Sequence, residues 1–159
     1  MATSLAIRRA VPGDAAAIAS VLHESFIEFR SLYTEGGFVA TVLNAESVLK
    51  RIHEGPVWIA FRDGTALGTV AALIKGSSVY IRGMAVLPSA RGTGLGTALL
   101  LEAEKWAASV GCSHLFLSTT PFLSSAIYLY QKFGFRRRAE NSRDLFGTPL
   151  FVMEKTISG

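Results

Sequence analysis

The feature that most constrains the fold is a glycine-rich segment, residues 84–100, which reads MAVLPSARGTGLGTALL. Apolar residues lead to Pro88, three glycines alternate at Gly92, Gly94 and Gly96, and a helix-forming run follows at once. Glycines let several backbone N–H groups converge, and a following helix adds unpaired N–H groups and the positive end of its dipole. A plain strand-to-helix connection usually needs one such glycine. Three of them favour a strand, loop and helix that bind a phosphate or diphosphate.

Two common phosphate-binding patterns do not fit this segment. The P-loop places Gly-Lys-Ser/Thr after its first glycine, but the chain has no lysine between Lys75 and Lys105. The dinucleotide fingerprint is G-x-G-x-x-G with an acidic residue about 20 positions later, whereas the spacing here is G-x-G-x-G without such a residue. Nucleotide hydrolysis and hydride transfer are therefore disfavoured.

Hydrophobic periodicity and turn residues predict alternating strands and helices along the whole chain. Asp14 is expected to cap the first helix, Gly36-Gly37 to break the chain, and Asp63-Gly64 to form a two-residue hairpin turn. The expected strands are 5–9, 57–61, 66–74, 78–87, 114–119, 135–138 and 149–155, and the expected helices are 15–29, 44–52, 97–109 and 124–133. This order predicts an α/β (α+β) fold, a mixed sheet with helices on both faces.

Composition narrows the class of protein. A chain of 159 residues that is half hydrophobic is expected to form one domain over 1–159. The formal charge is 16 − 12 = +4 without a basic stripe, so we expect no nucleic-acid partner. Cys112 stands alone and the three histidines lie far apart, so neither a disulfide nor a metal site is expected. No apolar run could span a membrane, and a cytoplasmic protein is the default.

Two motifs resemble the GNAT superfamily of N-acetyltransferases. Arg91-x-x-Gly94-x-Gly96, after a strand ending in Met-Ala-Val-x-Pro, matches that family's coenzyme A diphosphate motif, [Q/R]-x-x-G-x-[G/A]. The segment AIYLYQKFGF, residues 126–135, resembles its later pattern A-x-x-L-Y-x-x-x-G-F. Either motif alone is moderate evidence, but two in this order, about 30 residues apart, are much more specific.

The resemblance implies an acetyl-CoA-binding site. The family fold is a mostly antiparallel mixed sheet in which two central parallel strands splay apart and hold the pantetheine arm. By match, the cofactor-binding residues would be Met84, Ala85, Val86, Arg91, Gly92, Thr93, Gly94, Leu95, Gly96, Thr97 and Tyr130. The reaction implied is transfer of acetyl to a primary amine of a small molecule or peptide, with no metal. A homodimer is an open alternative to a monomer.

Tyr130 matches the family's catalytic tyrosine, which hydrogen-bonds or protonates the departing thiolate. With ordinary pKa values near 10 for the phenol and 8.5 for the thiol, full proton transfer is uphill by about 2 kcal/mol. Tyr130 is thus a hydrogen-bond donor to the thiolate or a phenol with a lowered pKa. The alternative is an ordinary core aromatic.

The chain departs from the family at two places. Leu123 stands where an asparagine is frequent, and residues 79–82 lack a frequent glutamate, so the general base is open. A base or its equivalent is needed because a lysine-like amine is neutral only about 0.04% of the time at pH 7. Glu28, Tyr80 through a water, or a chain of waters could serve. The acceptor is expected between residues 26–38 and 140–149.

The departures keep alternative functions open. A non-catalytic module of the same fold that binds or senses acyl-CoA is the first alternative. A nucleotide-binding protein of another fold is the second.

Overall fold

The computed structural model describes residues 5–138 and 143–157 and has an eight-stranded sheet in the order β1-β2-β3-β4-β5-β8-β6, with β7 paired to β8. Every neighbouring pair is antiparallel except β4 and β5, which are parallel. The strands are β1 Leu5–Arg9, β2 Val57–Arg62, β3 Thr65–Lys75, β4 Ser78–Val86, β5 His114–Thr119, β6 Arg136–Arg137, β7 Arg143–Leu145 and β8 Thr148–Thr156. The predicted mixed, mostly antiparallel sheet is confirmed.

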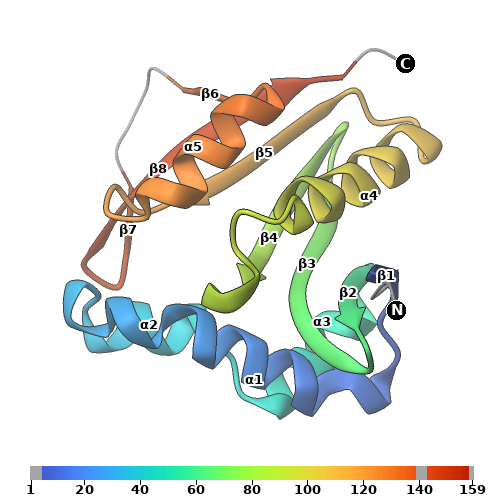
Figure 1. Cartoon of the computed structure of the whole chain (residues 1–159). Helices are drawn as coiled ribbons and strands as arrows, with labels where there is room; N and C mark the ends of the chain where they lie inside the picture. The colour runs from blue at the N-terminus through green and yellow to red at the C-terminus, as the bar shows by residue number, and fades with distance from the viewer. Residues whose placement is uncertain (1–4, 139–142, 158–159) are drawn as a thin grey trace.

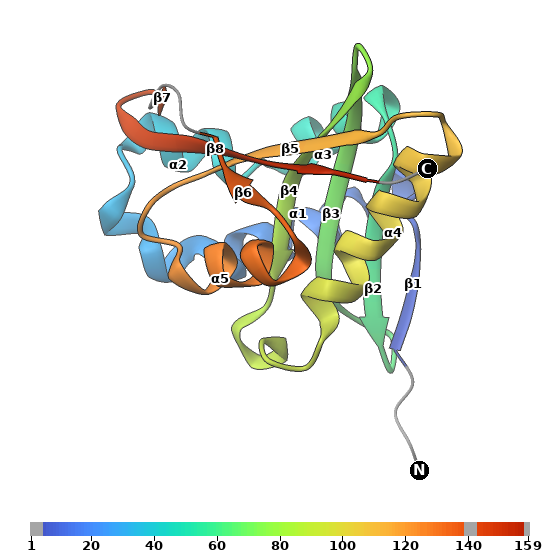
Figure 2. The same cartoon turned by 90° about the horizontal axis from the view of Figure 1, so that it is seen from above.

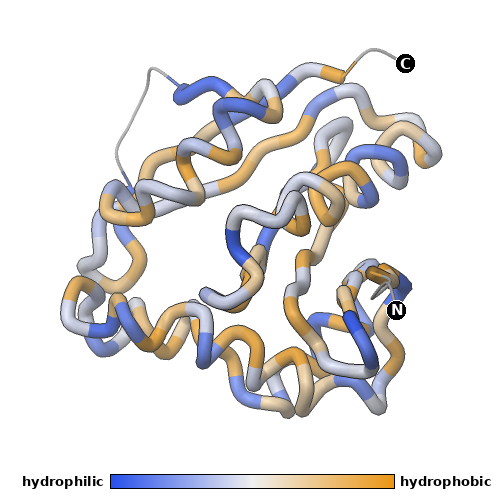
Figure 3. Tube along the Cα trace, viewed as in Figure 1, coloured by the Kyte–Doolittle hydropathy of each residue, from blue (hydrophilic) through white to orange (hydrophobic). Residues whose placement is uncertain are grey.

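Helices cover both faces of the sheet, as Figures 1 and 2 show. The helices are α1 Ala15–Phe26, α2 Glu35–Thr41, α3 Ala45–Glu54, α4 Leu95–Ser109 and α5 Ser124–Phe133, with 3₁₀ segments η1 Pro12–Asp14, η2 Ile27–Leu32 and η3 Pro88–Ala90. Successive β2 residues alternate between the two cores: Trp58 belongs to the core under α4 and α5, and Ile59 to the core under α1 and α3. In Figure 3 apolar residues accordingly follow the strands and recur along the helices between polar ones.

Helix α2 was not expected from the sequence, because Gly36-Gly37 was taken as a break. Both glycines lie inside the helix, and the β7–β8 hairpin packs against them so closely that a side chain would not fit. A Cβ on Gly36 would lie 2.8 Å from Phe146 Cβ, and a Cβ on Gly37 would overlap Thr148 Oγ1. Thr34 caps the helix by accepting a hydrogen bond from the Gly37 N–H at 3.0 Å. The glycines therefore serve close packing rather than chain reversal.

Asp14 occupies the predicted cap position of α1 but forms other hydrogen bonds. Its carboxylate accepts from the Val11 N–H at 2.8 Å and pairs with the Arg8 guanidinium at 2.8 Å, and no side-chain cap bond to α1 is formed. Both interactions hold the pKa of Asp14 below its usual range, with the Arg8 hydrogen bond contributing most.

Among the described residues, no helix is long and apolar enough to cross a bilayer.

Candidate functional site

Strands β4 and β5 are paired at one end only. The parallel register runs from Ser78 to Tyr80, and β5 then continues along β8 while β4 turns away, which Figure 1 shows as a widening gap. A bulge contributes to this divergence, because the β3–β4 register shifts between Thr69 and Ala71. Gly83 sits in the bulge with φ +62°, a conformation that favours glycine. The second half of β4 therefore has an edge without a strand partner, as the expected splayed pair requires.

The antiparallel alternation indicates which backbone groups face this gap. The Leu87 N–H donates to the Leu67 carbonyl of β3 at 2.9 Å, so it points toward β3. Adjacent residues alternate in direction, so the neighbouring Val86 N–H points away from β3. Val86 thus presents an unpaired donor to the gap.

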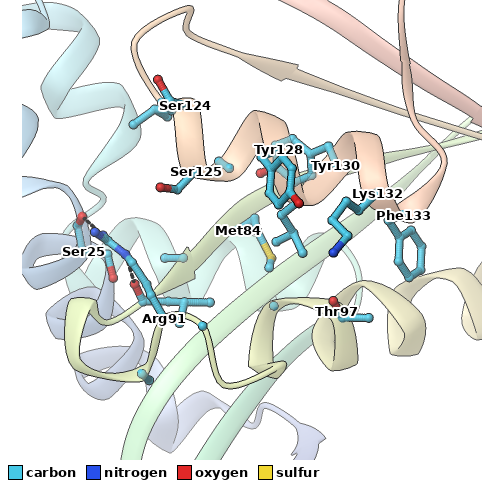
Figure 4. A pocket seen from close by; sticks show the side chains of 18 of the residues that line it. Ser25, Met84, Arg91, Thr97, Ser124, Ser125, Tyr128, Tyr130, Lys132 and Phe133 are labelled. Carbon is cyan, nitrogen blue, oxygen red and sulfur yellow. Dashed lines mark hydrogen bonds between the residues drawn. The ribbon is translucent and has the colours of Figure 1, made fainter.

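A cavity of about 810 Å³ lies where the strands part. It is enclosed by β4, the glycine-rich loop, the start of α4 and one side of α5, as Figure 4 shows. Nine of the eleven residues predicted to bind the cofactor line it: Met84, Ala85, Val86, Arg91, Gly92, Gly94, Gly96, Thr97 and Tyr130. The other two, Thr93 and Leu95, do not. The Thr93 hydroxyl donates to the Ala90 carbonyl at 2.5 Å, and the Leu95 side chain is buried in the core.

The glycine-rich loop leaves its amides unpaired. Among the described residues, none of the backbone N–H groups of residues 92–97 donates a hydrogen bond to the protein. Gly92 and Gly94 have φ of +77° and +84° with open space where a Cβ would be, so these two glycines set the backbone conformation. Gly96 is different, because a Cβ there would lie 2.6 Å from Leu129 Cδ2 of α5. It allows the two helices beside the cavity to approach.

The Arg91 side chain ties the loop to the first helix. Its guanidinium donates to Glu28 Oε1 at 2.6 Å, to the Ser25 carbonyl at 2.9 Å and to the Val86 carbonyl at 3.3 Å. A helix continuing to Phe29, as predicted, would use the Ser25 carbonyl for the Phe29 N–H. Arg91 instead donates to this carbonyl, and α1 ends at Phe26, where the 3₁₀ segment η2 begins.

Tyr130 is buried on the inner side of α5. Gly134 ends this helix in the left-handed region, and the Phe135 N–H donates to the Tyr130 carbonyl at 2.9 Å. The Phe135 ring then packs edge-on against Tyr130 at 6.0 Å, which accounts for the Tyr-x-x-x-Gly-Phe spacing. Burial, and secondarily Tyr33, raises the pKa of Tyr130. A phenol with a lowered pKa is therefore the wrong alternative in the ligand-free protein.

A smaller cavity of about 170 Å³ lies on the other side of Tyr130. Tyr130, Met84, Leu123 and Phe26 line both cavities, so the two meet at these side chains. The smaller cavity is otherwise lined by Tyr33, Ala40, Thr41, Arg51, Tyr80, Ile81, Arg82, Gly83, Leu117, Ser118, Thr119, Thr120, Leu145 and Leu150. The expected acceptor segments contribute Phe26, Tyr33 and Leu145, whereas residues 140–142 lie outside the described residues.

The other residues of the expected acceptor side differ in their burial and in the cavity that they line. Phe38 is buried against Tyr33, whereas Phe146 is exposed in the β7–β8 turn. Of the two candidate bases, Tyr80 lines the smaller cavity and Glu28 lines neither, being held by Arg91. Among the described lining residues of both cavities there is no carboxylate and no histidine.

Several lining residues were not predicted from the sequence. Ser25 and Lys132 line the larger cavity, and Figure 4 shows Lys132 directed from α5 toward Thr97. The Ser25 Oγ is buried without a hydrogen-bond partner among the described residues. Lys132 lies two positions after Tyr130 in the matched motif, so its place in that motif is the sequence feature from which its position near the cavity could have been predicted. No group of three or more metal-binding side chains occurs in the described part of the chain.

Comparisons with known proteins agree with this arrangement. The sequence model described as "Acetyltransferase (GNAT) family" matches residues 18–135. An uncharacterized N-acetyltransferase of Escherichia coli, YjgM, is 31% identical over 81% of this chain and 80% of its own length. An aminoglycoside N(6')-acetyltransferase type 1 of Salmonella typhimurium is 28% identical over 67% of this chain and 77% of its own. PaiA N-acetyltransferase of Thermoplasma acidophilum, solved with coenzyme A, has TM-score 0.82 at 24% identity, covering 96% of this chain and 99% of its own.

Proposed function

Because the chain belongs to the Acetyltransferase (GNAT) family, we propose that it moves an acetyl group from acetyl-CoA to a primary amine by direct attack of that amine. The observation that carries the proposal is the set of unpaired amides at residues 92–97, four of which, those of Gly92, Gly94, Gly96 and Thr97, belong to residues that line the 810 Å³ cavity. Unpaired N–H groups at a helix start are the donors that a diphosphate needs. Structures of similar fold that contain coenzyme A support this fit.

The donor would be held by the parted strands and the loop. Acetyl-CoA supplies a thioester, whose carbonyl carbon is the point of attack. The open edge of β4 at Met84, Ala85 and Val86 would pair with the pantetheine amides, and the Val86 N–H would hydrogen-bond the thioester oxygen. The amides of residues 92–97 would hold the diphosphate, with Lys132 nearby as a cation.

Tyr130 is suited to assist the leaving group by hydrogen bonding. The amine nitrogen forms the new C–N bond, the C–S bond breaks, and the amine loses a proton to solvent. Tyr130 lies where the two cavities meet, and its raised pKa keeps the phenol protonated at neutral pH. A protonated phenol donates a hydrogen bond to the thiolate, which finally takes a proton from water.

The incoming amine must lose a proton, and no carboxylate is among the described residues that line the two cavities. Tyr80 lines the smaller cavity and could relay the proton through a water. A water chain to solvent is the other route, since the cavity is partly open. Glu28 is a poorer candidate because its carboxylate is bound to Arg91 at 2.6 Å.

The test combines binding with thiol release. We expect calorimetry to show that the purified protein binds acetyl-CoA more tightly than ATP or NAD. A thiol-reactive dye should then report coenzyme A release when primary amines are added. Equal binding of ATP, NAD and acetyl-CoA, or none of any, would contradict the proposal.

The same measurements separate a second candidate function. The absence of a carboxylate or histidine among the described lining residues favours a module that binds acyl-CoA without catalysis. Such a module would bind acetyl-CoA tightly and release no thiol with any amine in a broad panel. Its Tyr130→Phe variant would bind acetyl-CoA as well as the parent and likewise release no thiol.

Four expectations from the sequence stay predictions. These are a single domain over residues 1–159, a cytoplasmic location, the lack of a nucleic-acid partner, and a homodimer as the alternative to a monomer. Light scattering of the purified protein would decide the last of these.

A further inference from the structure

The smaller cavity contains two arginines and no described carboxylate. Arg51 comes from the last turn of α3 and Arg82 from β4. Arg82 Nη2 pairs with Glu54 Oε1 at 2.6 Å, and the Glu54 side chain is half-exposed outside the cavity lining. The Arg51 guanidinium forms no ion pair within 4.0 Å and no side-chain hydrogen bond with the described residues that line the cavity. The cavity wall thus carries two positive charges, of which only the Arg82 charge is directly paired with a carboxylate, that of Glu54.

Arg51 lies beside the proposed reaction centre. Its Nη1 is 2.5 Å from the position that a Cβ on Gly83 would take, so the guanidinium rests on the backbone of the bulge. Gly83 is followed by Met84, which lines both cavities. The Arg51 guanidinium therefore contacts the residue next to Met84, and Met84 lies at the junction of the two cavities, where the thioester and the amine would meet.

Burial makes this charge costly without a ligand. Burial, and then the nearby Arg82, lowers the pKa of Arg51 to about 10, while Tyr80 and Glu54 act in the opposite direction, and the group stays protonated at neutral pH. An unpaired charge held away from water is unfavourable and is normally compensated by an opposite charge. A ligand that brought an anionic group into the cavity would supply that compensation.

Two further polar side-chain atoms in the same cavity are buried. Arg82 Nε is buried without a hydrogen-bond partner among the described residues, and Thr120 Oγ1, also buried, has only the neighbouring Tyr33 phenol as a side-chain partner. Both residues line the smaller cavity. Guanidinium N–H groups and a hydroxyl are donors suited to anionic oxygens. The unpartnered Arg82 Nε and the Arg51 guanidinium, which has no direct ion pair, thus point to one kind of ligand group.

We propose that the acceptor is a small amine that also carries an anionic oxygen group, a carboxylate or a phosphate, bound by Arg51 and Arg82. This inference rests on the proposed function and names the substrate class of that site. A volume of about 170 Å³ is below the range of drug-sized ligand pockets and suits an amino acid or a molecule of similar size. With the anionic group on Arg51, the amine of such a molecule faces Met84 and Tyr130. A polycationic amine is repelled by the same charge.

The experiment compares amines that differ only in the anionic group. Thiol release from acetyl-CoA is measured with amino acids and their primary amides, with lysine and cadaverine, and with phosphoethanolamine and ethanolamine. We expect kcat/KM for the anionic member to be about 10- to 100-fold higher, as for a charge-assisted contact. The amino acid and phosphate arms tell which anion is used. Equal rates within the pairs, or faster reaction of cadaverine, would overturn the proposal.

Variants assign the preference to Arg51. Arg51→Gln should remove most of the preference, Arg51→Lys should restore part of it, and Lys50→Gln, an exposed change on the same helix, should leave it intact. Acetyl-CoA affinity is measured on each variant by calorimetry and should stay within about twofold, because a group binding only the acceptor contributes nothing there. A preference that survives Arg51→Gln would overturn the role of Arg51.

Failure of this inference is distinct from failure of the proposed function. If acetyl-CoA binds and neutral amines react as fast as anionic ones, the transferase assignment stands and the anionic substrate class is wrong. If acetyl-CoA does not bind, the proposed function itself is wrong.

Discussion

Gly96 of α4 and Leu129 of α5 meet at a contact that leaves no room for a side chain on the glycine. A Cβ on Gly96 would lie 2.6 Å from Leu129 Cδ2 and 3.4 Å from Met84 Cε. Both helices border the larger cavity, so this contact sets its width. One glycine of the predicted diphosphate loop thus has a packing role as well.

Gly96→Ala is expected to destabilise the protein by about 1–3 kcal/mol, the usual cost of overpacking. The double variant Gly96→Ala with Leu129→Ala should recover part of that loss by removing the overlap. Urea unfolding measures both, with Gly13→Ala as the control because no atom lies within 4 Å of a Cβ there. A fully stable Gly96→Ala protein would mean that α5 moves freely, contrary to the packing described.

Gly94→Ala tests whether the loop conformation serves the ligand. Gly94 and Gly64 both have positive φ with open space around a Cβ, but Gly64 lies in the β2–β3 turn, away from the cavity. Alanine at either position should cost about 1–2 kcal/mol of backbone strain. Acetyl-CoA affinity, measured by calorimetry, should fall at least about tenfold for Gly94→Ala, because the amides are re-aimed, and stay unchanged for Gly64→Ala. Equal affinities would separate the loop from cofactor binding.

Tyr130→Phe should lower turnover by about 10- to 100-fold, the value of a hydrogen bond to a developing charge. Acetyl-CoA affinity should change little, because the ring that packs against Phe135 is kept. Steady-state thiol release and calorimetry give the two values. Tyr128→Phe, which removes an exposed phenol that lines the larger cavity and not the smaller one, is the control, and acetyl-CoA affinity is measured on it as well. Unchanged turnover in Tyr130→Phe would remove the phenol from the mechanism.

The buried phenol should also make stability fall at alkaline pH. Burial raises the pKa of Tyr130, while in the unfolded chain a tyrosine ionises near pH 10. Above about pH 10 the unfolded state therefore loses this proton first, and the free energy of unfolding declines as pH rises. Urea unfolding between pH 8 and 11 should show a shallower decline for Tyr130→Phe than for Tyr128→Phe. Parallel curves would mean that Tyr130 ionises normally in the fold.

Glu28→Gln distinguishes two roles of the Glu28 carboxylate, as general base of the reaction or only as ion-pair partner of Arg91. The pair is partly exposed on both sides, so its loss should cost no more than about 1 kcal/mol. We expect turnover at saturating substrate to stay within a few-fold and the acidic limb of the pH–rate profile to remain. Loss of that limb together with a 100-fold drop in turnover would instead identify Glu28 as the base.

Local signals in the sequence located most of the elements. Asp63 and Gly64 have φ of +52° and +76°, as the predicted two-residue turn requires. Gly134 ends α5 in the left-handed region, and β1, β5 and α5 begin and end at the predicted residues. Each of these features depends on neighbours within a few positions, which is the range over which turn residues and periodicity act.

Features that depend on distant residues were missed. Gly36-Gly37 looked like a break because the hairpin that fills the space beside them is more than 100 residues away in sequence. The predicted Asp14 cap fails for a local reason instead, because the Val11 N–H and the Arg8 side chain, three and six positions away, bind its carboxylate. The position of Arg51 on α3 is not predictable from the sequence, because nothing local places it against Gly83 of β4.

The sequence by itself determined that residues 84–100 form a strand, a loop with free amides and a helix. Backbone sterics at Gly92 and Gly94 and the unpaired first turn of α4 are local properties of those residues. Only the tertiary structure decided which side chains face the gap between β4 and β5. Packing alone brings Arg51 to Arg82 and leaves Tyr130 between the two cavities, because burial and charge pairing depend on segments that meet only in the folded chain.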